Sequence, residues 1–478
     1  MYMKPWKLSE LEAVLHCAVP VEAEIGKYYE TPDYISHTDT RKGAMNTIYH
    51  YVRSYMLGRK ARLVAKEAHR KTGRLLDIGT GTGYFADTMV RRGWKVGDCP
   101  CLVVKDTGRA LQQIARFYRE KFHPILVGIT GSVGKTTTKE MIACVLESQF
   151  CTLKTQGNLN NEIGQPKTLL GLEDCHQAAV IEMGMSHFGE ISRMARTAEP
   201  SIGVITNIGV SHIGNLGSQE NICKAKLEIC AGLAEGSPLV LNGDDPFLRK
   251  AALPGHVRPV WFSLGDESAD VCALNVRQEG DGMAFTLCDR AAGRYEVTIP
   301  AMGRHNVANA LAAYAAATRL GLAPEGVIAG LADFEQTGMR QKVVHAGGMD
   351  VIEDCYNANP DSMKAALAMF REYPCKRRFA LLGDMLELGE MSASAHEELG
   401  RLAAESDLYC LVTYGENAKR TAVVAAAKGV KTLHANNYRE AADALLNRIE
   451  PGDALLVKAS RGMALEKALA LFYPVCGK

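Results

Sequence analysis

The stretch Gly128-Ile-Thr-Gly-Ser-Val-Gly-Lys-Thr-Thr-Thr-Lys139 follows the apolar run Ile125-Leu126-Val127 and precedes the apolar run Met141-Ile-Ala-Cys-Val-Leu146. This order predicts a buried strand, a glycine-rich turn and then a helix. Glycines allow a backbone to close around phosphate groups, and the free N–H groups at a helix N-terminus attract anions. The stretch therefore predicts a nucleotide-binding protein with an α/β fold.

We interpret this turn as a phosphate-binding loop of the GxxxxGK[ST] type and expect Gly128 to be its first glycine. Lys135 adds a positive charge, and the hydroxyl of Thr136 is a natural ligand of Mg²⁺. The residues expected to contact the nucleotide in this loop are Gly131, Gly134, Lys135, Thr136 and Thr137.

The composition fits a water-soluble enzyme of about three domains, since the chain has 478 residues with 47% hydrophobic and 23% charged side chains. A net charge of +1 argues against a global attraction to nucleic acid or anionic lipid. The sequence has no long apolar span, its first residues lack the apolar core expected of a secretory signal, and its 14 cysteines lack paired CxxC spacing. We therefore expect a reduced, cytoplasmic protein that binds no nucleic acid and has no membrane span.

From residue 124 onward, short apolar runs alternate with helical patterns, which is typical of α/β proteins with a largely parallel sheet. The predicted organisation is an atypical N-terminal segment (1–96), a central ATPase-like domain (97–335) and a C-terminal Rossmann-like domain (336–478). Alternating polarity over 269–300 predicts a small group of antiparallel strands. An alanine-rich helix over 306–320 should end at Gly321. The C-terminal domain should contain strands at 350–354, 379–384, 408–412 and 454–458.

Three residues beyond the phosphate loop could supply metal ligands. Glu182 comes directly after a predicted buried strand, His212 lies just past the next one, and Lys226 lies on a predicted helix. A carboxylate and an imidazole near a phosphate loop are suitable ligands for a second Mg²⁺. Each also has an ordinary explanation, as a helix cap, a loop histidine and a solvated lysine, respectively.

Taken together, these motifs resemble the Mur ligase family of ATP-dependent amide ligases in peptidoglycan synthesis. The resemblance runs from about residue 97 to the C-terminus and includes 207–212, 225–228, Gly303-Arg-His-Asn306 with Asn309, and Gly338-Met-Arg340. It implies ATP and two Mg²⁺ ions, held by Thr136, Glu182, His212 and a carbamylated Lys226. It also implies that His305, Asn306 and Asn309 lie near the adenine. Arg340 and Asp354 would contact the phosphates and ribose after domain closure.

Three segments, 155–164, 354–363 and 382–389, resemble the branch of this family that adds D-alanyl-D-alanine to UDP-N-acetylmuramoyl-tripeptide. In the implied reaction, a substrate carboxylate attacks the γ-phosphate of ATP, and an amine then attacks the resulting acyl phosphate. Lys135, His212 and Lys226 would be the catalytic residues, acting by positioning and charge stabilisation. The substrates would be small molecules.

The N-terminal segment departs from this pattern. Residues 7–24 resemble the opening helix of the family's UDP-binding domain, whereas 74–85, with Gly79, Gly81 and Gly83, resemble the first motif of S-adenosylmethionine-dependent methyltransferases. We expect 28–96 to be a methyltransferase-like fragment that replaces the UDP-binding domain and impairs the ligase. A different Mur-type or folylpolyglutamate-type ligase, a methyltransferase fusion, and a protein that binds ATP without ligating remain alternatives.

Overall fold

The structure is a computed structural model that describes residues 44–69, 71–72, 84–94, 104, 106–336 and 338–477. The chain divides into two compact units, Met1–Phe117 and Tyr118–Lys478, and the division falls inside helix α4 (Thr107–Arg119). In the first unit, α2 (Ala44–Glu67) and α3 (Tyr84–Val90) enclose a small cluster of Ala61, Met89 and Trp94. The segment 7–24 and the glycines Gly79, Gly81 and Gly83 lie outside the described residues.

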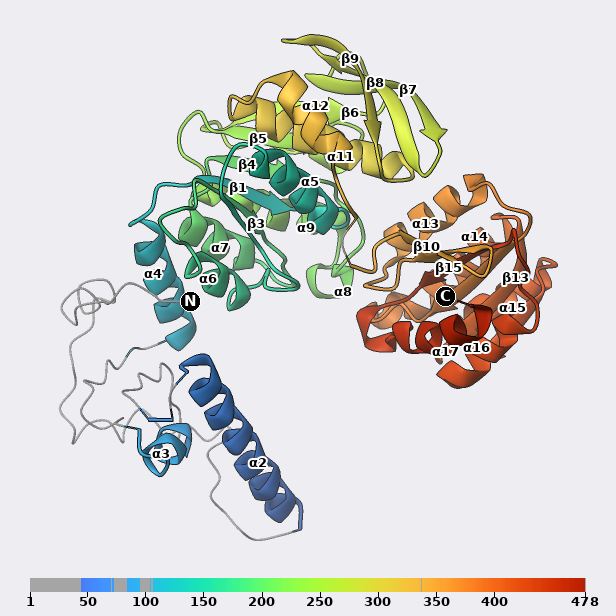
Figure 1. Cartoon of the computed structure of the whole chain (residues 1–478). Helices are drawn as coiled ribbons and strands as arrows, with labels where there is room; N and C mark the ends of the chain where they lie inside the picture. Colours follow the sequence, from blue (N-terminus) through green and yellow to red (C-terminus); the bar gives the residue numbers. More distant parts are fainter. Residues whose placement is uncertain are drawn as a thin grey trace. The chain divides into compact units, whose positions relative to one another are not determined.

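The second unit contains a nine-stranded sheet in the order β2-β3-β1-β4-β5-β6-β7-β8-β9. Neighbours from β2 to β7 are parallel, whereas β7, β8 and β9 form an antiparallel meander at one end (Figure 1). The antiparallel strands predicted over 269–300 are therefore confirmed. The strands are β1 (Ile125–Thr130), β2 (Thr152–Lys154), β3 (Ala178–Glu182), β4 (Ile202–Ile205), β5 (Pro238–Asn242), β6 (Arg258–Ser263), β7 (Val271–Glu279), β8 (Gly282–Asp289) and β9 (Gly293–Ile299).

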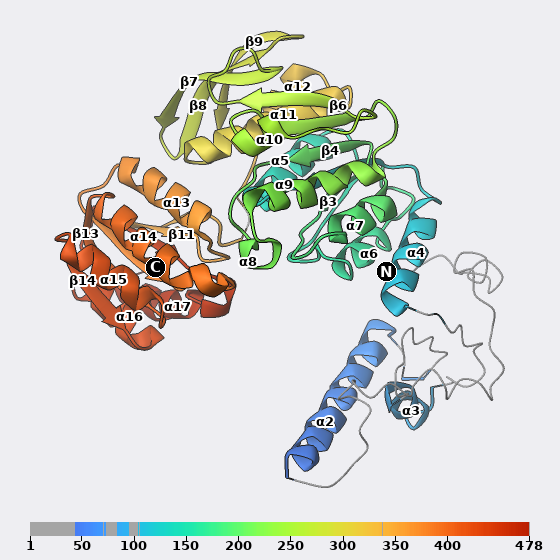
Figure 2. The same ribbon diagram turned by 180° about the vertical axis from the view of Figure 1, so that it is seen from behind.

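Helices cover both faces of this sheet. Figure 1 shows α5, α11 and α12 over one face, and Figure 2 shows α9 and α10 from behind. The alanine-rich α11 confirms the helix predicted at 306–320, and its small buried side chains allow it to pack closely against α5 and the sheet. The helices of this part are α5 (Lys135–Glu147), α6 (Gly164–Leu169), α7 (Glu190–Ala198), α8 (Ile213–Leu216), α9 (Gln219–Leu227), α10 (Pro246–Lys250), α11 (Arg304–Arg319) and α12 (Pro324–Ala332), with a 3₁₀ turn η3 (Glu228–Gly232).

A six-stranded sheet follows, in the order β10-β11-β15-β12-β13-β14. Only β10 is antiparallel to its neighbour. The four predicted strands correspond to β11 (Met349–Glu353), β12 (Arg378–Gly383), β13 (Leu408–Tyr414) and β15 (Ala454–Lys458). The edge strands β10 (Lys342–Ala346) and β14 (Thr432–Ala435) were not predicted, because both are short and only partly buried.

The helices of this part are α13 (Pro360–Glu372), α14 (Ser392–Ala404), α15 (Ala418–Ala427), α16 (Tyr438–Leu446) and α17 (Glu466–Cys476), with 3₁₀ turns η4 (Gly389–Met391) and η5 (Arg461–Met463). They cover a core on each face of the sheet. In the described ranges, no helix has the length and apolar character that crossing a bilayer requires.

Candidate nucleotide and metal site

The phosphate loop connects β1 to α5 and begins at Gly131, so the prediction that Gly128 is its first glycine is wrong. Gly128 lies inside β1, paired with Ile181 and Gly203, and it is one residue too far from Gly134 for the GxxxxGK[ST] pattern. Gly131 and Gly134 have φ angles of 151° and 84°, which side chains rarely adopt. A Cβ at either position would also collide with a neighbouring side chain.

The end of β4 holds this loop in place. The side chain of Asn207 accepts a hydrogen bond from Val133 N (2.9 Å) and donates one to Val133 O (3.0 Å). Ser132 Oγ accepts a hydrogen bond from Gly209 N at 2.8 Å. The loop is therefore fixed before any ligand arrives.

Lys135 folds back over its own loop. Its Nζ donates to the carbonyls of Gly131 (2.8 Å) and Ser132 (3.1 Å), and no ion pair of Lys135 is found among the described residues. Burial lowers the pKa of Lys135; the nearby carboxylate of Glu182 raises it, and the charge of Arg340 lowers it further. This cation is satisfied only by carbonyl oxygens and can bind an anion instead.

Glu182 and Thr136 are in direct contact. Thr136 Oγ1 donates to Glu182 Oε2 at 2.9 Å, and Asn160 Nδ2 donates to Glu182 Oε1 at 2.8 Å. Glu182 is the last residue of β3 rather than the residue after the strand, and its exposed fraction is only 2%. A buried carboxylate beside a hydroxyl offers the hard oxygen ligands that Mg²⁺ prefers.

His212 and Lys226 both have lowered pKa values. Burial lowers the pKa of His212, and the positive charges of Lys135 and Lys226 lower it further, which favours a neutral ring that can ligate a metal. Lys226, on α9, is 2% exposed, and burial followed by the charge of Lys135 brings its pKa well below the usual value. No hydrogen bond of its amine is found in the described part of the chain.

The beginning of α11 forms a polar network that reaches the C-terminal sheet. His305 Nε2 lies 3.1 Å from Gln341 Oε1, and Asn306 Nδ2 donates to the same oxygen at 2.9 Å. Asn309 Nδ2 donates to Asn306 Oδ1 at 3.0 Å. Gln341 was not predicted as a site residue. Its φ of 52° places it in strained backbone.

The C-terminal sheet contributes a second charged group. Lys458 Nζ, at the end of β15, forms an ion pair with Asp354 Oδ2 at 2.8 Å and donates to Asn357 O at 3.1 Å. The Arg340 guanidinium lies 4.2 Å from the centre of the Tyr356 ring. Lys458 was predicted as part of a strand but not as a site residue.

These groups surround one cavity of about 410 Å³. Gly131 and Lys226 are not in its wall. The sequence did not indicate Gln341, Lys458 and Ser460 as site residues, and it included Asn160 and Ser211 only within the segments 155–164 and 207–212. Eleven of the predicted site residues line the cavity: Gly134, Lys135, Thr136, Thr137, Glu182, His212, His305, Asn306, Asn309, Arg340 and Asp354.

A phosphate loop at the carboxyl edge of one parallel sheet, with a second α/β sheet on the same cavity, defines a nucleotide-dependent α/β enzyme. Two family models match the chain, the Mur ligase middle domain over residues 129–317 and the Mur ligase glutamate ligase domain over 339–461. The chain belongs to the Mur ligase family.

Relatives and solved structures agree with this assignment. The chain is 40% identical over 373 residues to the UDP-N-acetylmuramoyl-tripeptide–D-alanyl-D-alanine ligase of Bacillus subtilis (strain 168), covering 77% of this chain and 79% of the relative. MurF from Acinetobacter baumannii superposes with a TM-score of 0.75 at 32% identity, covering 84% of this chain and 93% of that one. MurF ligase from Thermotoga maritima in complex with ADP gives a TM-score of 0.75 at 26% identity, covering 84% and 94%.

The expected replacement of the N-terminal domain by a methyltransferase fragment is not supported. The ligase of the same name from Haemophilus influenzae is 33% identical over 446 residues, covering 91% of this chain and 92% of the relative. An alignment of that length must include part of residues 28–96. The resemblance to the ligase thus extends into residues 28–96, which the glycine-rich motif had suggested to be a methyltransferase-like fragment.

Proposed function

We propose that this protein is the ATP-dependent ligase that adds D-alanyl-D-alanine to UDP-N-acetylmuramoyl-tripeptide. The observation that carries the proposal is the single cavity that gathers Lys135, Thr136 and Glu182 from one sheet and Asp354 and Lys458 from another. The names of its relatives supply the substrates. We further propose that 97–335 and 336–478 act as separate domains, and that the protein is cytoplasmic.

The reaction needs no protein nucleophile. The tripeptide carboxylate attacks the γ-phosphorus of ATP, so that an acyl phosphate forms and ADP leaves. The amine of D-alanyl-D-alanine then attacks the acyl carbon; the carbon–oxygen bond to phosphate breaks, and the amine loses a proton. Lys135 releases its loop carbonyls and binds the transferring phosphoryl group, stabilising its charge.

Thr136 and Glu182 would hold Mg²⁺ through their oxygens, which suit that ion. The neutral ring of His212 would add a nitrogen ligand, as the resemblance to the family implies. When bound, the ion neutralises phosphate charge. Glu182 is kept in place by Asn160, so the carboxylate is oriented in advance. His305, Asn306 and Asn309 would contact the adenine, while Arg340 and Asp354 would contact phosphate and ribose.

Lys226 would be carbamylated and act as a ligand for a second Mg²⁺. A buried ammonium without a partner is costly, whereas a neutral amine can attack CO₂, forming a nitrogen–carbon bond and releasing a proton. Protein equilibrated with ¹³C-bicarbonate should give a carbamate carbon signal that is missing in Lys226→Arg. An identical spectrum in both proteins would exclude the modification.

The function is tested by phosphate release from ATP with purified full-length protein. Release should require both UDP-N-acetylmuramoyl-tripeptide and D-alanyl-D-alanine, and mass spectrometry should detect the pentapeptide product. An acceptor panel of single amino acids and glutamate separates this activity from those of other Mur-type and folylpolyglutamate-type ligases. Turnover with a single amino acid but not with D-alanyl-D-alanine would overturn the proposal.

A further inference from the structure

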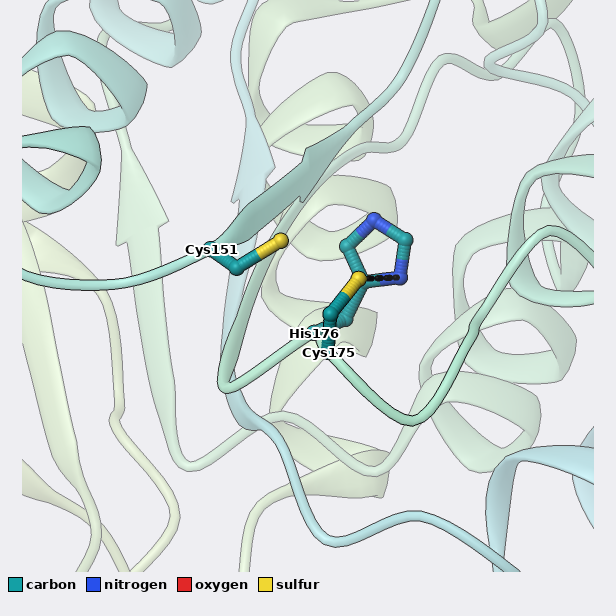
Figure 3. A group of neighbouring side chains, drawn as sticks. All are labelled: Cys151, Cys175 and His176. Atoms are coloured by element: carbon teal, nitrogen blue, oxygen red, sulfur yellow. Dashed lines mark hydrogen bonds between the residues drawn. The ribbon is translucent and has the colours of Figure 1, made fainter.

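Two thiols and an imidazole gather at the amino end of the central sheet, away from the nucleotide cavity. Cys151 directly precedes β2, and Cys175 and His176 lie in the turn that leads to β3 (Figure 3). One ligand atom from each residue lies within 4.8 Å of the others, and Cys175 Sγ is 3.9 Å from His176 Nδ1. Among the residues the structure describes, this is the one such group of histidine, cysteine and carboxylate side chains.

The spacing suits a tetrahedral metal ion. With Zn–S bonds of about 2.3 Å and Zn–N bonds of about 2.0 Å, a sulfur and a nitrogen on one tetrahedral zinc ion lie about 3.5 Å apart. The 3.9 Å between Cys175 Sγ and His176 Nδ1 is close to that value. Cys151 Sγ lies within 4.8 Å of Cys175 Sγ and of a ring nitrogen of His176. Small side-chain rotations are enough to converge the three atoms.

The backbone fixes these side chains relative to one another. Cys151 O accepts hydrogen bonds from Gln177 N (2.9 Å) and Ala178 N (3.4 Å), which joins the two chain segments. His176 N donates to Glu173 O at 3.0 Å, and Glu173 N donates to His176 Nδ1 at 2.9 Å. The lone pair of Nδ1 is therefore in use, and a cation at that nitrogen replaces one backbone hydrogen bond.

We propose that Cys151, Cys175 and His176 bind a thiophilic divalent cation, Zn²⁺. Thiolate sulfur and imidazole nitrogen are the ligands that zinc prefers over Mg²⁺ or Ca²⁺. Water from the surrounding solvent supplies the fourth ligand. Both cysteines are exposed and the histidine is half-buried, so the ion can enter from solvent.

The bound ion joins the edge strand β2 to β3 at the end opposite the active site. Beyond the other end of β2, Thr155 Oγ1 accepts a hydrogen bond from Glu182 N at 3.0 Å. The ion therefore stabilises the edge of the sheet that carries Glu182, without touching any group in the nucleotide cavity. Its effect should appear in stability, not in turnover.

The test uses metal-free, fully reduced full-length protein titrated with Co²⁺, whose thiolate complexes absorb in the near ultraviolet and, when tetrahedral, strongly in the red. The variants are Cys151→Ser, Cys175→Ser and His176→Ala. Cys375→Ser serves as the matched control, because Cys375 is also a free thiol but lies outside the cluster. Cys99→Ser with Cys101→Ser removes the two cysteines that lie closest together in the sequence. Melting curves without metal verify that each variant folds.

We expect one equivalent of cobalt with thiolate bands, displaced by Zn²⁺, together with a higher Tm for the zinc-bound protein. Each cluster variant should lose that equivalent and weaken zinc binding by more than about 100-fold, since even outer-shell substitutions cost 10–100-fold. The cysteine controls should bind like wild type. Unchanged binding in folded Cys175→Ser, or no thiolate band in wild type with Cys151 and Cys175 shown to be reduced, would overturn the proposal.

Discussion

The two sheets that form the nucleotide cavity each bring a lysine to it, and the two lysines differ in what their ammonium groups contact. Lys135 follows β1 and bonds only to the carbonyls of its own loop. Lys458 ends β15 and is paired with the carboxylate of Asp354 at 2.8 Å. Both lysines line the same cavity.

The charge of Lys135 is therefore available to a ligand, whereas the charge of Lys458 is already paired with a carboxylate of the protein. An anion can displace the loop carbonyls from Lys135 without leaving a protein charge unpaired. Displacing Lys458 would leave Asp354 buried without its cation, which is costly. We infer that Lys135 acts on the transferring phosphate, whereas Lys458 orients Asp354 toward the nucleotide.

Lys135→Ala tests the first half of this comparison and should have the largest effect on activity. Loss of one preorganised charge at a transferring phosphoryl group should lower kcat by about 10³-fold. The Tm should stay near that of wild type, because the lysine bonds only to its own loop. Kinetics of D-alanyl-D-alanine-dependent phosphate release and thermal melts measure both. The exposed Lys167→Ala is the matched control, and a comparable loss in that variant would contradict the assignment.

Lys458→Met tests the second half. Breaking a buried ion pair by removing one partner destabilises a protein by about 3–5 kcal/mol, so the variant should unfold at clearly lower urea concentrations than wild type. The double variant Asp354→Asn/Lys458→Met should recover part of the stability but not the affinity for ATP. If the single variant is as stable as wild type, the ion pair of Lys458 does not stabilise the protein, and the proposed difference between Lys458 and Lys135 is wrong.

Much of this site could be predicted from local sequence, because a phosphate loop and the ends of parallel strands place their residues by simple geometry. Lys135, Thr136 and Glu182 come together through two adjacent parallel strands, β1 and β3. The order of apolar runs was enough to predict this. The error at Gly128 arose because a buried glycine within a strand and a loop glycine look alike in sequence.

The missed residues depend on long-range contacts. Gln341 accepts hydrogen bonds from a helix that begins some 35 residues earlier in the chain, and no local pattern indicates that pairing. Lys458 meets Asp354 only because β15 lies beside β11. Strand order within a sheet cannot be read from single strands, so contacts of this kind require the fold.

Asp453→Asn tests whether ion pairs of the C-terminal sheet outside the cavity affect stability alone. Arg377 Nε donates to Asp453 Oδ1 at 3.0 Å at the amino end of β15. Burial alone would raise the pKa of Asp453, but the hydrogen bonds from Arg377 and from Glu450 N bring it below its usual value. The substitution should cost about 2 kcal/mol at pH 7, with unchanged turnover.

The pH dependence has a defined sign. Because the folded-state pKa of Asp453 is lowered, its contribution is complete above the unfolded value of about 3.9 and is lost as pH falls through the folded value. Urea melts of wild type and Asp453→Asn should therefore differ at neutral pH and converge in strong acid. A difference that grows on acidification would show that this pair does not stabilise the sheet.

Asp361→Ala should have the smallest effect and tests a direct link between the two sheets. Asp361 Oδ2, in the first turn of α13, accepts a hydrogen bond from Val210 N at 2.9 Å, two residues before His212. Losing one hydrogen bond of about 1 kcal/mol should lower kcat/KM about fivefold with little change in Tm. Asp361→Asn keeps an acceptor oxygen and should retain most of the activity. If the alanine and asparagine variants are equally active, this contact does not position His212.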